Sequence, residues 1–205
     1  VLEAQSEEQQ KQNIALLFDI NRMANERERA LSTLAERQAP NGGWSWFPGG
    51  RENWYITQYM VEGFGHLKTL GALSMQDDER TTQMVEKALA YCEDEALKHY
   101  KELEKQVNTG KAKWGDDHLD NIMIHFLYAR SFYKTDAQNS PVIPYYLSQA
   151  EKHWLGKGLY QEGLLALVLH RHGKKEAAQK IVASLRERAL VKDELGMYWP
   201  FDWGM

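Results

Sequence analysis

Apolar residues recur at helical spacing along most of this chain. Between residues 6 and 37 they include Ile14, Leu17, Leu31 and Leu34, which stand three or four positions apart or at multiples of that spacing. Acidic residues at the start of the segment suit the positive end of a helix dipole. The pattern predicts one long helix over residues 6–37, or two in tandem, that ends at the Pro-Asn-Gly-Gly sequence which follows.

Further segments of helical length follow one another to the end of the chain. Their apolar spacing predicts helices over residues 54–70, 76–106, 117–133, 145–155, 159–172 and 174–190. Gly71 is predicted to cap the first of these at its C-terminus. No segment shows the alternation expected of a strand. The sequence therefore predicts an all-α protein.

Two kinds of helix alternate along the chain. Residues 163–173 are apolar almost all round, whereas residues 174–188 are apolar on one face only. A buried helix followed by a half-exposed one predicts a helical hairpin with an inner and an outer member, and residues 54–106 show the same order. Short stretches that contain tryptophan and glycine precede the inner helices, namely GGWSW (residues 42–46), KWGDD (113–117) and WLGKG (154–158). These degenerate repeats predict an α/α toroid, as a single domain over residues 1–205 and a partial ring cut from a larger chain.

One stretch, QAPNGGWSWFPGGRENWYITQYM (residues 38–60), departs from the helical pattern. It holds four glycines, two prolines and three tryptophans. Gln38, Gly42 and Trp44 form a Q-x-x-x-G-x-W motif, which is typical of helical toroids. Glycine permits the chain to reverse, the indole covers apolar surface, and the glutamine amide can bond unpaired groups at a helix end. We predict that the stretch is a structural corner rather than a catalytic loop.

Residues 34–73 resemble the thioester-type helical domain of bacterial α2-macroglobulin-like proteins, relatives of complement factors. In that family a helix ends in glutamine, a D/N-G-G-W turn follows, and the next helix opens near an aromatic-x-Thr. The matching residues are Gln38, Asn41, Gly42, Gly43, Trp44, Tyr55 and Thr57. The similarity is strong over residues 1–73, and over residues 110–205 it lies in the repeat character alone.

The resemblance implies part of a large bacterial protease-trapping protein in the periplasm, the cell envelope or the extracellular space. Cleavage of a bait region collapses such a protein around the protease, and in many members an internal thioester then acylates the target. The expected partners are other domains of the parent chain and target proteases. The helical domain itself is expected to have a structural and interactive role, without enzymatic activity or a cofactor.

The thioester requires a cysteine followed three positions later by glutamine, and this chain does not supply that pair. Cys92 is the one cysteine, and Glu93, Asp94 and Glu95 follow it. We predict that Cys92 is a core residue inside a helix and that the thioester segment lies outside this sequence. The loop over residues 47–53 contains no histidine, so the resemblance does not extend to histidine-assisted acyl transfer.

A toroid enzyme is the competing hypothesis. Asp116, Asp117 and Asp120 match the D-D-x-x-D pattern that binds magnesium and a diphosphate in terpenoid-type enzymes. Aspartate is also favoured at helix starts, and we favour that interpretation because no second metal motif is present. His118 and His125 are predicted to share one helix face, two turns apart, as packing or surface histidines.

A glycosidase-like toroid would need two carboxylates across a cleft. Glu62, Asp116, Asp117 and Glu162 lie at or near predicted inner helices and are its candidates. Acid-rich helices are more often solvated faces, so this alternative ranks below the structural role.

Charge and hydropathy limit the remaining classes of partner. The net charge is −4, with both signs scattered, which argues against a nucleic-acid surface. No apolar run has the length of a membrane span, so we predict no membrane contact by this segment. A partial ring would leave apolar edges uncovered, and we expect the isolated chain to self-associate.

Overall fold

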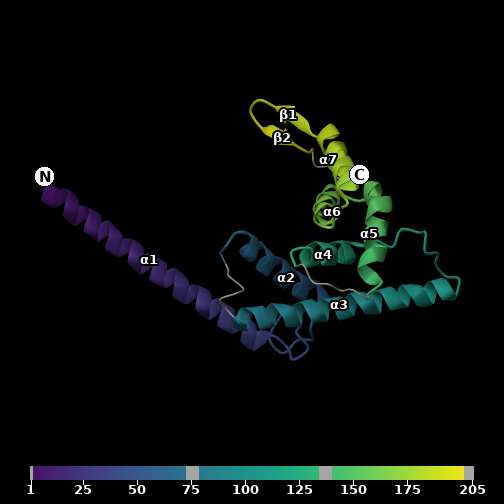
Figure 1. The fold of residues 1–205 in the computed structure, drawn as a ribbon, viewed down its shortest axis with the longest axis horizontal. Helices are drawn as coiled ribbons and strands as arrows, with labels where there is room; N and C mark the ends of the chain where they lie inside the picture. Colours follow the sequence, from purple (N-terminus) through teal and green to yellow (C-terminus); the bar gives the residue numbers. More distant parts are fainter. Residues whose placement is uncertain (1, 73–78, 134–139, 201–205) are drawn as a thin grey trace.

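The computed structural model describes residues 2–72, 79–133 and 140–200, and most of them are helical (Figure 1). The helices are α1 (Leu2–Arg37), α2 (Trp54–Thr69), α3 (Glu79–Asn108), α4 (Asn121–Arg130), α5 (Val142–His153), α6 (Leu159–Arg171) and α7 (Lys175–Glu187). A short 3-10 turn, Trp154–Gly156, joins α5 to α6. The all-α prediction is confirmed. Positions 76–78, with which the predicted third helix begins, lie outside the described residues.

A small β-hairpin at the C-terminal end is the element that the sequence pattern missed. Strand β1 (Leu190–Lys192) pairs antiparallel with β2 (Gly196–Tyr198), so the prediction that α7 continues to residue 190 was wrong. Each strand has three residues, too few to show an alternating pattern. Gly196 has a φ of +67°, a conformation that glycine adopts without strain.

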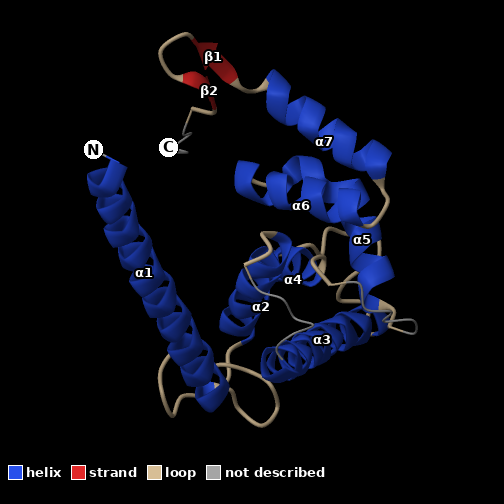
Figure 2. Cartoon of the chain, turned by 60° about the vertical axis from the view of Figure 1, so that its left-hand side comes forward, coloured by secondary structure: helices blue, strands red, loops and turns tan. Residues whose placement is uncertain are grey.

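Helices α2, α4 and α6 form an inner row. Helix α2 packs against α4, and α4 packs against α6, while α3 lies beside α2 and α7 beside α6 (Figure 2). Every residue of α4 from Met123 to Arg130 is buried, whereas α7 buries Ala178 and Ile181 alone. This is the order of inner and outer helices that the repeat pattern predicts. The described elements do not establish a closed ring, so the toroid stays a prediction.

Helix α1 extends away from the other helices (Figure 1). Its residues from 21 to 30 are all exposed, and Leu31 is the first of its described side chains that is buried. The C-terminal end of α1 lies against α3, where Arg80 donates a hydrogen bond to Glu28 over 2.7 Å. The predicted helix is therefore confirmed as one continuous element, and it is held at one end.

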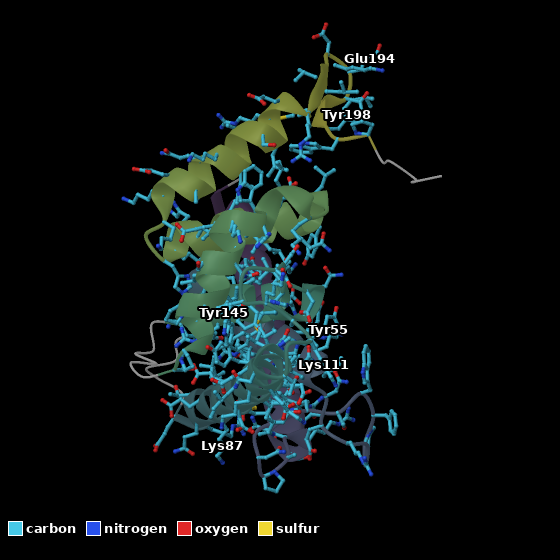
Figure 3. All side chains as sticks on the ribbon, turned by 90° about the vertical axis from the view of Figure 1, so that its right-hand side faces the viewer. Tyr55, Lys87, Lys111, Tyr145, Glu194 and Tyr198 are labelled. Carbon is cyan, nitrogen blue, oxygen red and sulfur yellow. The ribbon has the colours of Figure 1, made fainter. Side chains whose placement is uncertain are left out.

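The core lies between the inner row and α3. Met123, Ile124 and Leu127 of α4 have no exposed surface, and side chains fill the space between the helices (Figure 3). Cys92 on α3 is 2% exposed, and burial, followed by the charges of Glu93 and Glu95, raises the pKa of its thiol. A buried, protonated thiol is a poor nucleophile, which agrees with the predicted core role.

Two helix boundaries in the middle of the chain differ from those predicted. Helix α4 begins at Asn121 rather than at Asp117, because Asp120 is its N-cap and accepts a hydrogen bond from the Met123 amide over 2.8 Å. Helix α5 begins at Val142, three positions before the predicted start, with Pro141 at the N-cap. Gly71, with a φ of +68°, follows the end of α2 as predicted.

Candidate functional site

The corner over residues 38–57 joins the ends of α1, α2 and α3. The Gln38 side-chain amide donates to the Gly42 carbonyl over 2.9 Å and to the Met84 carbonyl of α3 over 2.8 Å. Its one NH₂ group therefore satisfies two backbone acceptors, one in the turn and one in the neighbouring helix. The sequence predicts that the glutamine bonds unpaired groups at a helix end, whereas in the structure its amide connects the turn to a carbonyl inside α3.

Trp44 is the buried centre of the corner. Its indole is 3% exposed, and Nε1 donates to the Leu34 carbonyl near the end of α1 over 2.9 Å. Its backbone N–H donates to the Thr57 hydroxyl over 2.9 Å, which fixes the turn to the first turn of α2. The ring lies 6.5 Å from that of Phe64, also on α2. The one tryptophan therefore connects both helices to the loop between them.

Asn41, Gly42 and Gly43 form the turn itself. The Gly43 amide donates to the Asn41 side chain over 3.1 Å. Gly42 has a φ of +91°, and a Cβ at this position would lie 2.2 Å from the Lys87 carbonyl oxygen of α3. A Cβ at Gly43 would lie 2.8 Å from that of Glu52. Both glycines are therefore required by close packing, and Gly42 also by its backbone conformation.

An open pocket of about 420 Å³ lies beside the corner. Its lining is mostly apolar and includes Leu34, Trp44, Trp46, Phe47, Ile56 and Met60. Trp46 and Phe47 are about two-thirds exposed, and Tyr55 stacks on Trp46 with ring centroids 6.3 Å apart. Tyr55, which matches the family pattern, therefore lies outside the buried corner and forms part of an exposed aromatic surface.

Sequence reasoning missed the helix cap at the far side of the corner. Asn53 is the N-cap of α2, and its side chain accepts a hydrogen bond from the Ile56 amide over 3.0 Å. Asparagine immediately before an apolar helical run is an ordinary start signal. The signal was therefore present in the sequence, immediately before the predicted helix at residue 54.

Sequence reasoning also missed an inner polar cluster, formed by Gln58, Glu62 and His66 of α2 with His125 and Tyr128 of α4. His125 Nδ1 lies 2.9 Å from Gln58 Oε1, and His125 Nε2 lies 2.6 Å from Glu62 Oε2. The other Glu62 oxygen lies 3.3 Å from His66 Nε2, which is 3.4 Å from the Tyr128 hydroxyl. Gln58 and His125 are buried and His66 is exposed, so the cluster joins two inner helices through a network that runs from the core to the surface.

The aspartate-rich segment lines a second open pocket, of about 310 Å³. Lys157 donates to both carboxylate oxygens of Asp117, over 2.9 and 2.7 Å, and to the Leu119 carbonyl. Burial favours the neutral acid, yet the Lys157 contact holds the pKa of Asp117 below its usual value. Asp116 accepts a hydrogen bond from the Lys113 amide over 3.1 Å.

The prediction that His118 and His125 share one helix face was wrong, and the helix start that the aspartates predict lies at Asp120 rather than at Asp116 and Asp117. Asp116, Asp117 and His118 precede α4, while Asp120 caps it and His125 lies inside it. The His118 ring contacts the Lys113 carbonyl over 2.8 Å, away from the inner polar cluster. Within residues 2–72, 79–133 and 140–200, no group of three or more His, Cys, Asp or Glu side chains is placed to hold a metal ion.

Three of the four candidate carboxylates of a glycosidase, Glu62, Asp117 and Glu162, each pair with a different basic side chain, and the fourth, Asp116, accepts a hydrogen bond from the Lys113 backbone amide. Glu162 on α6 has no exposed surface and forms an ion pair with Arg188. Glu62 is paired with histidines and Asp117 with Lys157. Their partners belong to different helices and loops. Among the described residues, no hydrogen bond or ion pair connects two of these acids. The described contacts therefore support neither the glycosidase-like nor the diphosphate-binding enzyme.

Comparison of the chain with protein-family models, with characterised proteins and with solved structures finds no match. Among the helices that the structure describes, none combines the length and apolar character of a membrane-spanning helix.

Removing the Asp120 carboxylate is expected to destabilise the protein at neutral pH but not in acid. Partial burial would raise the pKa of Asp120, whose side chain is half exposed, but hydrogen bonds from His99 and the Met123 amide hold this pKa below the usual value. A lowered pKa means that the ionised carboxylate stabilises the fold above about pH 4 and that this contribution is lost as the pH falls through the folded-state value. We expect Asp120→Ala to cost about 1–2 kcal/mol at pH 7.

Urea unfolding of both proteins at pH 7, pH 5 and pH 3 tests this prediction. The difference between them should persist at pH 5 and shrink at pH 3. Asp116→Ala is the matched control, because this exposed side chain accepts one hydrogen bond and caps no helix. A difference for Asp120→Ala that stays constant down to pH 3 would contradict the electrostatic explanation.

Proposed function

We propose that this chain is part of the helical domain of a bacterial α2-macroglobulin-like protease-trapping protein. Its role there is structural and interactive: the domain presents or shields a thioester segment and packs against neighbouring domains. The proposed location is the periplasm, the cell envelope or the extracellular space. Other domains of the parent chain and target proteases are the proposed partners.

The observation that carries the proposal is the corner. The six motif residues Gln38, Asn41, Gly42, Gly43, Trp44 and Thr57 meet in one hydrogen-bonded turn between α1, α2 and α3. The motif therefore has a physical reason to recur wherever such helices meet at such a turn. The row of inner helices with outer helices beside them supports the same architecture. Because fold alone does not determine function, the resemblance of these six residues to the family pattern is what favours this role over others.

Methylamine labelling of the native protein tests the proposal. The protein is isolated from its own cells, treated with isotopically labelled methylamine and analysed by peptide mass spectrometry. Label on a glutamine outside these 205 residues would support a covalent trap. An unlabelled, much larger parent that compacts when a protease cleaves it would support a non-covalent trap. A native protein of 205 residues, or a large parent that neither labels nor compacts, would overturn the proposal.

We also expect the isolated chain to self-associate. Large apolar side chains are exposed in its C-terminal third: Leu155, Leu159, Leu167, Val182, Leu190, Val191, Leu195 and Met197. Where exposed apolar side chains form a contiguous patch, the patch commonly marks an interaction surface. Light scattering over a concentration series should show growing mass, and the variant Val191→Lys/Leu195→Lys should reduce it, since these side chains are 70% and 66% exposed. A monomer at every concentration would contradict the prediction.

A further inference from the structure

An open groove of about 400 Å³ lies between the last two helices, and we call it the α6–α7 groove. Small and aliphatic side chains line it, among them Ala166 and Leu167 of α6 and Ala178, Val182 and Ala183 of α7. Ala166 and Ala178 are buried, whereas Leu167 is 45% and Val182 is 39% exposed. The groove therefore has room for the side chains of a neighbouring element, and it has apolar surface that such an element would cover.

The inner row shows what occupies the equivalent grooves of the other two hairpins. Helices α2 and α3 form the first hairpin, and α4 packs against both of them (Figure 2). Helices α4 and α5 form the second hairpin, and α6 packs against both of these. Each inner helix therefore fills the groove of the hairpin that precedes it. Among the described elements, none fills the groove of the third hairpin, α6–α7.

The two sides of α6 agree with this order. The Arg171 guanidinium carbon lies 5.2 Å from the ring centroid of Tyr128 and 3.9 Å from that of Phe132, so this side of α6 faces the end of α4. Successive residues of an α-helix are about 100° apart round its axis, which places Ala166, five positions before Arg171, about 140° away from it. The groove side of α6 therefore points away from α4, in the direction in which the row would continue.

The groove also carries a guanidinium group. The Arg186 side chain lines the groove and forms no hydrogen bond or ion pair with any residue that the structure describes. This group is always charged, and within the described part of the chain no Asp or Glu side chain lines the groove. A second copy of the same groove would bring arginine against arginine, whereas an acidic side chain of a different segment would complement the charge.

We propose that the α6–α7 groove binds a further inner helix, which belongs to the same polypeptide but lies outside these 205 residues. This helix is apolar on most sides, as α4 is, and carries an acidic side chain that pairs with Arg186. Leu167 and Val182 pack against it, and the alanines of the groove let the helix axes approach closely. The inference rests on one part of the proposed function, that this chain belongs to a longer one, and not on the trapping mechanism.

Photo-crosslinking of the native full-length protein, produced in its own cells, tests the proposal. The photoreactive residue p-benzoylphenylalanine replaces Leu167 in the groove or, as the matched control, Lys180, an exposed residue of α7 that does not line the groove. After irradiation, the mass of the denatured product and its linked peptides are measured. We expect position 167 to link, within a single chain, to one apolar helical segment that contains Asp or Glu and lies outside these 205 residues. Position 180 should not link to that segment.

A pair of substitutions tests the same contact without crosslinking. Leu167→Gln/Val182→Gln changes side chains that are already partly exposed in the 205-residue chain, so the urea midpoint of that chain, measured in dilute solution, should change little. In the full-length protein the same substitutions place two amides against an apolar helix, and its urea midpoint should fall clearly further. Lys180→Gln should leave both midpoints unchanged, because this side chain lies outside the groove.

The proposal is overturned by a crosslinked product of two chains, by a link to a separate protein, by no link that distinguishes position 167 from position 180, or by equal midpoint shifts in the two proteins. A native protein of 205 residues would overturn it as well. A larger parent that forms the expected link but neither reacts with methylamine nor compacts would support this inference and contradict the proposed function. A labelled parent without the link would have the reverse meaning.

Discussion

Trp44→Ala should cost about 3–5 kcal/mol of folding free energy, the usual range for truncating a fully packed tryptophan. The indole is 3% exposed and lies against Phe64, so the substitution leaves a cavity. It also removes the donor to the Leu34 carbonyl. Because the same side chain contacts both ends of the corner, the loss weakens the attachment of α1 as well as the packing of α2. Urea unfolding followed by circular dichroism measures the cost.

The chain supplies a matched control two positions away. Trp46 is 66% exposed and stacks only on Tyr55, so Trp46→Ala should cost about 1 kcal/mol or less. Trp44→Phe should fall between the two, since it keeps most of the packed ring and loses the hydrogen bond to Leu34. Equal costs for Trp44→Ala and Trp46→Ala would show that the corner is not the buried junction described above.

The corner could be predicted from the sequence because its interactions are local. Gln38, Gly42 and Trp44 lie within seven positions, and each has a chemistry that suits the reversal of a chain between helices. The partner of Gln38 on α3, the Met84 carbonyl, is 46 positions away and leaves no sequence signal, because every residue offers a carbonyl. The motif predicted a turn, and the structure adds which helix the turn is fastened to.

The inner polar cluster could not be predicted, because its members are far apart in the sequence. Gln58 and His125 are separated by 67 positions, and each taken alone is an ordinary polar residue in an amphipathic helix. The helix start in the aspartate-rich segment was placed wrongly for the opposite reason. Three aspartates within five positions offer several helix starts, and in the structure Asp117 pairs with the distant Lys157 while Asp120 is the cap.

The resemblance to macroglobulin domains and the alternation of helices predict the same local architecture from different signals. The resemblance depends on the residue types of the family motif within residues 1–73. The alternation of inner and outer helices depends on how apolar each helix is. The packing of α2 on α4 and of α4 on α6 supports the alternation without reference to any family.

Gly42→Ala should destabilise the protein by more than about 3 kcal/mol, well above the usual effect of a glycine substitution. Two costs add at this position. The φ of +91° is unfavourable for any L side chain, at roughly 1–2 kcal/mol. A Cβ would also lie 2.2 Å from the Lys87 carbonyl oxygen (Lys87 is labelled in Figure 3), far closer than real Cβ contacts. That oxygen belongs to the backbone of α3, so no side-chain rotation relieves the overlap.

Gly49→Ala separates these two costs. Gly49 also has a positive φ, +78°, but a Cβ there would meet nothing within 4 Å. Its substitution should cost only the conformational part, about 1–2 kcal/mol. The difference between the two variants, measured by urea unfolding under the same conditions, isolates the contact between the turn and α3. Equal costs would mean that α3 moves away at little expense, and the corner would then be a flexible joint rather than the fixed junction on which the structural role depends.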